Sequence, residues 1–302
     1  MSIREYFWND TMARVAAYVP TKKLCRLAVR MFIGTQVFPK NRDMAFKLLD
    51  AAAVNSRSLD QLNQIQFSIA QLKKIEAVET GKPQLLKEAN NELSVLCRED
   101  YIVAKFAMGK ELMKINKKAN PSTQKQMEVL SRQYLSECAA SSYAPSYYYF
   151  GMAHEQGIGG PVNKQQAEGW IARAANEDDP KAFFKLSQWY LVKEDKEMYF
   201  KYMKLAAELG LNEAQHNLGV YYNEQGDIRK AVAWFYQAAK NAFYPSIINL
   251  GIIFLNGRGE FAANPLIAYI WLKNAQRVED STMIQKLVSE AEKALDEIGI
   301  KF

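Results

Sequence analysis

Histidine and cysteine are scarce in this chain of 302 residues, which has two histidines and three cysteines. His154 and His216 stand far apart in the sequence, so neither a histidine-based triad nor a metal cluster is supported. Cys25, Cys97 and Cys138 are too widely spaced for a Cys-x2-Cys metal site, and their number is odd. We therefore expect no catalytic residue, no metal and no cofactor, and we interpret Cys138 as a small core residue.

Long apolar runs are also missing. The longest, residues 247–255, is interrupted by Asn249 and is far shorter than the roughly 20 residues that a membrane-spanning helix needs. The N-terminal region lacks a secretory apolar segment of adequate length. The sequence therefore predicts no transmembrane segment and no exported protein.

An excess of either charge is missing from most of the chain. Residues 1–60 hold ten Lys or Arg against five Asp or Glu, whereas residues 61–302 hold 29 against 28. The candidate docking residues in the basic part are Lys22, Lys23, Arg26 and Arg30. Two interpretations stay open: a solvated helix face, or a surface that meets anionic lipid, RNA or an acidic partner.

What the chain does have is a repeated ladder of small and large residues. A small residue is followed by an aromatic residue or Leu three positions on and by a small pair seven and eight positions on. The six copies are Ala45/Leu48/Ala52-Ala53, Ser131/Tyr134/Cys138-Ala139, Ala167/Trp170/Ala174-Ala175, Tyr199/Tyr202/Ala206-Ala207, Ala231/Trp234/Ala238-Ala239 and Ala268/Trp271/Ala275-Gln276. These spacings place the residues on one face of an α-helix.

A second helical pattern follows each of the four middle copies at one fixed distance. It begins with a small residue and continues four and five positions later with a large apolar and a small residue. The four copies are Ser146/Phe150-Gly151, Ala182/Leu186-Ser187, Ala214/Leu218-Gly219 and Ser246/Leu250-Gly251. The sequence therefore predicts an all-α fold of repeated helix pairs.

Residues 212–219, with Tyr221-Tyr222, Gly226-Asp227, Ala231, Trp234 and Ala238-Ala239, resemble one full Sel-one-like repeat, a relative of the tetratricopeptide repeat. The resemblance implies a right-handed superhelical α-solenoid of paired antiparallel helices and a non-catalytic adaptor. Some secreted bacterial relatives carry a disulfide in each repeat, and this chain does not follow that pattern. A reducing intracellular compartment is therefore expected.

The resemblance varies along the chain and suggests four segments. Residues 1–21 form a basic amphipathic segment or anchor, and residues 22–100 form degenerate helical repeats. Residues 101–276 form the Sel-one-like repeats, and residues 277–302 form a C-terminal capping helix. The structural positions of the repeat are taken as Ala174, Trp170, Gly219, Ala238, Trp234, Gly251 and Trp271.

Adjacent aromatic residues mark three of the predicted helices. Because neighbouring side chains on a helix cannot all face one core, Tyr147, Tyr190 and Tyr222 are candidate partner-binding residues. The alternative is that each pair fills both sides of a thin two-layer solenoid. The glycine-rich segments 157–160 and 257–259 lack a preceding strand and a Gly-Lys-Ser/Thr ending, so they are interpreted as turns rather than phosphate loops.

These features favour a protein–protein interaction scaffold whose partners are protein subunits of a larger assembly. The basic N-terminal part further suggests an accessory or assembly subunit of a mitochondrial membrane complex, with a mitochondrial location favoured over a cytosolic one. The alternative is an RNA-associated helical-repeat protein, such as a peripheral ribosomal subunit. Against that alternative, residues 151–302 hold 17 basic and 19 acidic residues and offer no long basic stripe.

Overall fold

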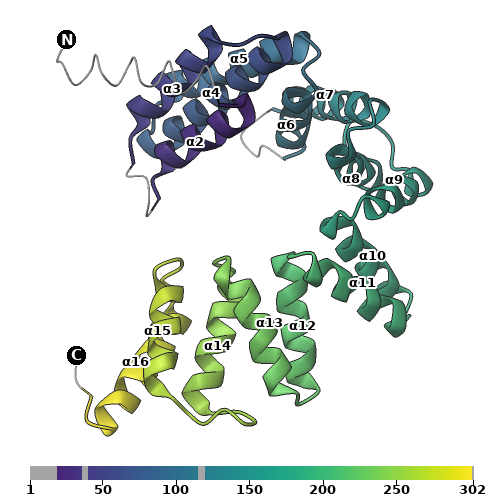
Figure 1. The fold of residues 1–302 in the computed structure, drawn as a ribbon. Coiled ribbons are helices and arrows are strands. Elements are labelled where there is room, and N and C mark those ends of the chain that lie inside the picture. The colour runs from purple at the N-terminus through teal and green to yellow at the C-terminus, as the bar shows by residue number, and fades with distance from the viewer. Residues whose placement is uncertain (1–18, 36–39, 115–119, 301–302) are drawn as a thin grey trace, which may run out of the picture. The chain divides into compact units, whose positions relative to one another are not determined.

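The computed structural model describes residues 19–35, 40–114 and 120–300, and these residues fold into α-helices (Figure 1). In chain order the helices are α2 Thr21–Ile33, α3 Arg42–Val54, α4 Leu59–Thr80, α5 Pro83–Arg98, α6 Ile102–Leu112, α7 Pro121–Ala140, the 3-10 turn η1 Ala144–Ser146, α8 Tyr147–Gln156, α9 Lys164–Asn176, α10 Pro180–Val192, α11 Lys196–Glu208, α12 Asn212–Glu224, α13 Ile228–Lys240, α14 Tyr244–Asn256, α15 Pro265–Gln276 and α16 Thr282–Glu297. Within the described residues, β-structure is limited to one isolated bridge between Arg258 and Phe261. The prediction of an all-α fold of helix pairs is confirmed.

The chain forms two compact units. Unit 1 comprises Met1–Tyr149 and Gln156–Val162, and unit 2 comprises Phe150–Glu155 and Asn163–Phe302. In unit 1 the packed pairs are α2 with α3, α4 with α5, and α6 with α7; in unit 2 they are α10 with α11, α12 with α13, and α14 with α15. The predicted segments were defined by how closely each part of the chain resembles the repeat, and their boundaries stay predictions. Residues 1–18 of the predicted N-terminal segment lie outside the described residues.

A large, fully buried side chain closes the seam between the helices of a pair. It stands four positions after the first small residue of the ladder, one place beyond the aromatic residue or Leu. In the six copies it is Leu49, Leu135, Ile171, Met203, Phe235 and Leu272. The large member of the ladder seen in the sequence is instead the residue before it. Trp170, Trp234 and Trp271 are in fact partly exposed.

Helix geometry explains this difference. With 3.6 residues per turn, a residue four positions on lies about 40° from the first small residue, whereas one three positions on lies about 60° away on the other side. The seam therefore falls closer to Phe235 than to Trp234. Ala174 and Ala238, which complete the ladder, are fully buried.

The facing helix supplies a glycine at the same seam. A Cβ atom added to Gly219 would lie 2.5 Å from the Phe235 ring, and one added to Gly251 would lie 2.6 Å from Leu272. Separations this short cannot be accommodated unless the neighbouring side chain moves. The glycines therefore allow the two helices of a pair to approach closely.

Four of the turns between successive pairs share one backbone geometry. Each contains a residue of positive φ four positions after the first residue of the small pair: Ser142 (56°), Asp178 (54°), Gly210 (89°) and Ala242 (57°). The amide of the next residue donates to the carbonyl of that first small-pair residue, as in the bond of 3.0 Å from Asp179 to Ala174. This is a Schellman-type helix ending, and it sets the direction of the following helix.

The last helix covers the end of unit 2. Helix α16 packs on α15 and buries Ile284, Val288, Ala291 and Leu295. Its opposite face carries Lys286 and Glu290, which form an exposed ion pair. No described helix is long and apolar enough to cross a bilayer.

Candidate partner-binding site

A hollow of about 250 Å³ lies in unit 2 where α9 meets α10. Its lining combines apolar and charged residues: Glu155, Lys164, Ala167, Glu168, Trp189, Val192 and Lys193. A hollow of this size is smaller than the roughly 300–1,000 Å³ of pockets that hold drug-sized ligands. It suits one large side chain of a partner protein.

The orientation of Trp189 is fixed by a small polar network. Its ring nitrogen Nε1 donates to Glu155 Oε1 at 3.0 Å. Lys185, one helical turn before Trp189, places its ammonium 2.7 Å from Glu155 Oε2 and 5.8 Å from the centre of the Trp189 ring. The indole is therefore held in place before any partner arrives, which reduces the entropy cost of binding.

The end of α10 beside this hollow is apolar and exposed. Val192 is 84% exposed and Leu191 is 56% exposed. Lys164 and Lys193 add positive charge to the lining, and Glu168 adds one negative charge. The hollow therefore brings apolar groups together with charges of both signs, a mixture that protein–protein contacts commonly have.

Tyr190, one of the three tyrosines predicted to bind a partner, packs against the next helix instead of lining the hollow. Its ring stacks on that of Tyr202 of α11, with centroids 5.4 Å apart and planes at 17°. Phe183 stacks on the same Tyr202 at 6.1 Å. Because Trp189 faces the hollow while Tyr190 faces α11, the adjacent pair serves two sides of α10. Sequence reasoning did not rank Trp189 as a candidate.

The other two tyrosines are placed differently from each other. Tyr147 is 9% exposed and belongs to the core of unit 1. Tyr222 is partly exposed and contacts Phe200 and Tyr221, with the Lys230 ammonium 5.1 Å from its ring centre. Burial of Tyr147 favours the alternative interpretation, a packing role, for that residue. The binding role of Tyr190 and Tyr222 stays a prediction.

The predicted basic docking residues lie on one helix. Lys22, Lys23, Arg26 and Arg30 are all exposed on α2, whose opposite side buries Leu24 and Phe32. No ion pair joins these four side chains to any residue within the described ranges. Their charge is therefore available to solvent, and their docking role stays a prediction.

An ionic cluster in unit 1 is formed by the buried Lys105 with Asp100 and Glu137, whose carboxylates are more exposed. Burial opposes the charge of this amine, but hydrogen bonds to Asp100 and Glu137 outweigh it and raise the pKa of Lys105 above its usual value. Burial raises the pKa of Cys97 to about 11 and that of Cys138 to about 12. Both thiols are therefore protonated at neutral pH and are poor nucleophiles.

The two histidines pack within the helical layers. His216 Nδ1 lies 2.9 Å from Ser246 Oγ, and its ring is 5.5 Å from those of Phe235 and Phe243. Burial lowers the pKa of His216. Across the described ranges, no three His, Cys, Asp or Glu side chains are grouped to hold a metal ion. The expected absence of catalysis and of a cofactor stays a prediction.

Comparison with protein families gives matches that recur along the chain. A model of the Sel1 repeat matches residues 24–53, 144–179, 186–211, 212–243 and 245–275, which together make up about half of the chain. The first match corresponds to α2 and α3, inside the segment that the sequence analysis describes as degenerate. Residues 54–143 are not matched.

Solved structures show the same architecture. A Sel1 repeat protein from Oxalobacter formigenes is similar over 93% of this chain and 80% of that chain, with a TM-score of 0.63 and 19% identity. The immunity protein Pa5087 from Pseudomonas aeruginosa is similar over 70% of this chain and 82% of its own, with a TM-score of 0.50 and 15% identity. At these identities the likeness shows the fold alone.

One curated relative is similar in sequence over a shorter stretch. The chitin synthase regulator SKT5 of Malassezia restricta is 32% identical over 124 residues, which cover 37% of this chain. The chain spans 8% of the length of that relative.

Proposed function

The chain belongs to the Sel1 repeat family, and we propose that it is a non-catalytic scaffold whose unit 2 captures a side chain of a partner protein in the Trp189 hollow. The single observation that carries this proposal is the hollow itself. Its indole is held by Glu155, and the apolar Val192 in its lining is exposed to solvent. An aromatic anchor on a partner is the kind of group that such a pocket binds most strongly.

Two general observations support a scaffold. Sel1 repeat proteins are generally protein-interaction scaffolds. One relative in sequence is named as a regulator of an enzyme, a role that a protein can perform by binding alone. The raised pKa values of Cys97 and Cys138 agree with a chain that works by binding.

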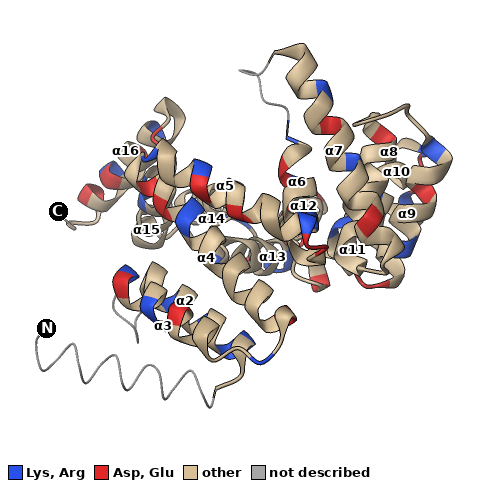
Figure 2. Cartoon of the chain, turned by 90° about the horizontal axis from the view of Figure 1, so that it is seen from above, with Lys and Arg blue, Asp and Glu red and all other residues tan. Residues whose placement is uncertain are grey.

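A finer proposal concerns the setting. We propose that the chain is an accessory or assembly subunit of a larger complex, inside the cell and in mitochondria. Support comes from the exposed basic residues of α2 and from three free, buried cysteines, which are typical of a reducing compartment. In the alternative of an RNA-associated protein, a basic stripe should follow the helices. Figure 2 shows blue and red positions interspersed along the helices instead.

The test is affinity purification of the tagged protein from its source, with and without nuclease. Val192→Asp places a charge in the lining of the hollow without removing a buried group, and should reduce recovery of stoichiometric partners by about tenfold. Val54→Asp is the matched control, since Val54 is 86% exposed at the end of α3. Equal recovery by the two variants would contradict the binding role of the hollow.

The same purification tests the finer proposals. Recovery of mitochondrial complex subunits that survive nuclease would support the accessory-subunit proposal. Ribosomal proteins that are lost on nuclease treatment would support RNA association instead. Cell fractionation tests the location independently.

A further inference from the structure

The second helices of the repeats present different residues to solvent at equivalent positions. Two positions on each helix can be compared, one lying two places before the first residue of the ladder and the other two places after it. At the first position the residues are Gln165 in α9, Glu197 in α11, Arg229 in α13 and Leu266 in α15. At the second position they are Gly169, Lys201, Ala233 and Ile270, in the same order of helices. All eight residues are exposed. Helix α15 therefore carries large aliphatic side chains where the other three carry polar or small ones.

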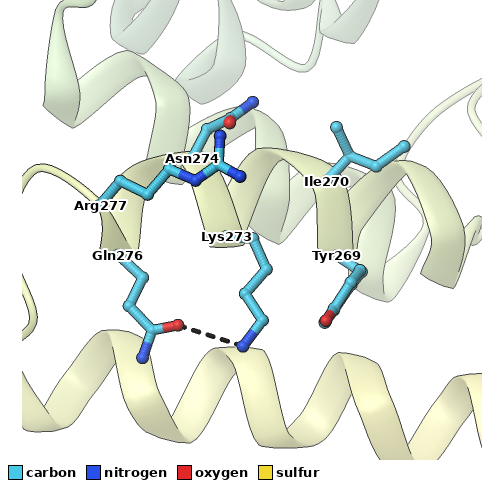
Figure 3. A pocket seen from close by; sticks show the side chains of 6 residues that line it. All are labelled: Tyr269, Ile270, Lys273, Asn274, Gln276 and Arg277. Carbon is cyan, nitrogen blue, oxygen red and sulfur yellow. Dashed lines mark hydrogen bonds between the residues drawn. The ribbon is translucent and has the colours of Figure 1, made fainter. Parts of the chain in front are cut away.

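The exposed aliphatic residues of α15 continue into an open hollow of about 680 Å³ along the second half of the helix. In Figure 3, Ile270, Asn274 and Arg277 project from one side of α15, while Tyr269, Lys273 and Gln276 project from the other. Lys273 is paired with Glu292 of α16 at 3.4 Å, so its side of α15 is covered. On the other side, Ile270 is 52% exposed and Arg277 is also exposed.

The neighbouring helix α13 extends this surface. Tyr236 is 47% exposed, and its ring lies 6.2 Å from that of Trp271. Nine places after the first small residue, α13 carries Lys240, and Arg277 stands at the equivalent place directly after α15. We call the exposed face formed by Leu266, Ile267, Ile270, Arg277, Tyr236 and Lys240 the outer face.

The two charged residues of the outer face, Lys240 and Arg277, are both basic. Neither α13 nor α15 contains an Asp or Glu, whereas α9 contains Glu168 and α11 contains Glu197 and Glu208. Within the described residues, Lys240 and Arg277 have no ion-pair partner. An unpaired basic group beside exposed aliphatic groups is complementary to a segment that is apolar and acidic.

We propose that the outer face binds an acidic amphipathic helix of a partner protein. This inference rests on the proposed scaffold function and names the chemistry of one partner. Apolar side chains of the partner helix, three or four positions apart, pack on Ile267, Ile270 and Tyr236. Carboxylates beside them face Lys240 and Arg277.

An anionic membrane is a poorer match for this surface. Each basic residue near a membrane adds a small increment to lipid affinity, and stable electrostatic attachment uses clusters of about four to eight of them. Lys230 is paired with Asp227 at 2.7 Å and Lys273 with Glu292 at 3.4 Å, which leaves Arg229 and Lys240 on α13 and Arg277 directly after α15. A helix of opposite charge uses the same few groups more effectively because it also covers the aliphatic residues.

The test measures binding of two labelled synthetic peptides of about 18 residues by fluorescence anisotropy, using the full chain. Both peptides carry leucines at helical i, i+3, i+4 and i+7 spacing, with glutamate at the remaining positions in one and lysine in the other. The glutamate peptide should bind about tenfold more tightly than the lysine peptide. Combining Ile270→Asp with Arg277→Glu should abolish that preference.

The matched control combines Gly169→Asp with Asn176→Glu, which changes the equivalent exposed positions of α9 and should leave binding unchanged. If the Ile270→Asp, Arg277→Glu variant does not fold, as judged by circular dichroism, Lys240→Glu replaces it and should weaken binding by a smaller factor. Equal affinity for the two peptides, or equal loss in the control, would overturn the proposal. So would tighter binding to phosphatidylserine vesicles than to the glutamate peptide, or self-association that the outer-face variant removes.

Partner recovery separates this proposal from the scaffold function. An outer-face variant that keeps all stoichiometric partners, beside a Val192→Asp variant that loses them, would overturn the outer-face proposal and leave the scaffold intact. A wild-type chain that recovers no stoichiometric partner would overturn the scaffold function itself.

Discussion

The seam between paired helices and the solvent-exposed side of the second helices follow opposite rules. At the seam, the same combination recurs in both units: glycine on one helix and a fully buried large residue on the other, as in Gly109 with Leu135 and Gly219 with Phe235. On the solvent-exposed side of the second helices, equivalent positions differ from helix to helix, as Gly169 of α9 and Ile270 of α15 do. Residues needed for stability are therefore repeated, whereas residues that can recognise a partner are the exceptions.

The largest test of this comparison is at the seam. Phe235→Ala removes a fully buried ring that faces Gly219 and should lower the free energy of unfolding by about 3–5 kcal/mol. Trp234→Ala should cost less because that side chain is partly exposed. Urea denaturation measures both, and a larger effect at Trp234 would show that the seam has been assigned to the wrong residue.

Two glycines provide a smaller test with opposite signs. Gly219→Ala forces a methyl group against Phe235 and should lower the free energy of unfolding by about 1–3 kcal/mol. Gly169→Ala meets no atom within 4 Å on the exposed side of α9 and should raise it by about 0.5–1 kcal/mol. Thermal melting of the two variants shows whether each one raises or lowers stability. Destabilisation by both would contradict the distinction between the seam and the exposed side of the second helices.

A pH test uses His216, which packs against Phe235 of the seam. Because burial lowers the pKa of His216, the unfolded chain binds a proton at a pH where the folded chain does not. Stability from this group is complete above the unfolded pKa of about 6.5 and falls as the pH decreases toward the folded value.

The free energy of unfolding of His216→Gln should therefore depend less on pH between pH 7 and pH 5 than that of the wild type. Urea denaturation at several pH values measures how the free energy of unfolding changes with pH in the wild type and in His216→Gln. The variant His154→Gln is measured in the same way for comparison. An unchanged pH dependence in His216→Gln would contradict the assignment.

The smallest expected effect is on the outer face. Ile270→Asp replaces a side chain that is 52% exposed and should change the free energy of unfolding by no more than about 0.5 kcal/mol. Leu272→Asp, two residues further on, places a charge in the seam and should prevent stable folding. A large stability loss in Ile270→Asp would show that the outer face belongs to the core.

Periodicity was sufficient to predict helix pairs. Small residues stand at helical spacing within each ladder, as Ala167 with Ala174 and Ala231 with Ala238 do, and all four are buried. Periodicity did not distinguish Trp234 from Phe235, since two neighbouring large apolar residues differ by one position in a pattern that tolerates both. The angle from the first small residue of the ladder, about 40° for Phe235 against about 60° for Trp234, decides between them.

The candidate hollow was harder to predict. Trp189 and Tyr190 are equivalent by composition, and their difference depends on Glu155, which lies on another helix. The spacing of Lys185 and Trp189 on one helix face was a usable signal. The exposed aliphatic residues of α15 were also readable, by comparing Ile270 with Gly169 at the same place in the ladder.

The shared turn geometry has a consequence for how such a chain can change its length. Asp178, Gly210 and Ala242 recur at one constant interval, and each stands at the same point of the same hydrogen-bonded turn. A gene that is cut at one of these points and rejoined at the next loses one whole helix pair, and the new junction has the backbone conformation of the old ones. Recombination can thus add or remove whole helix pairs, because no new turn has to evolve.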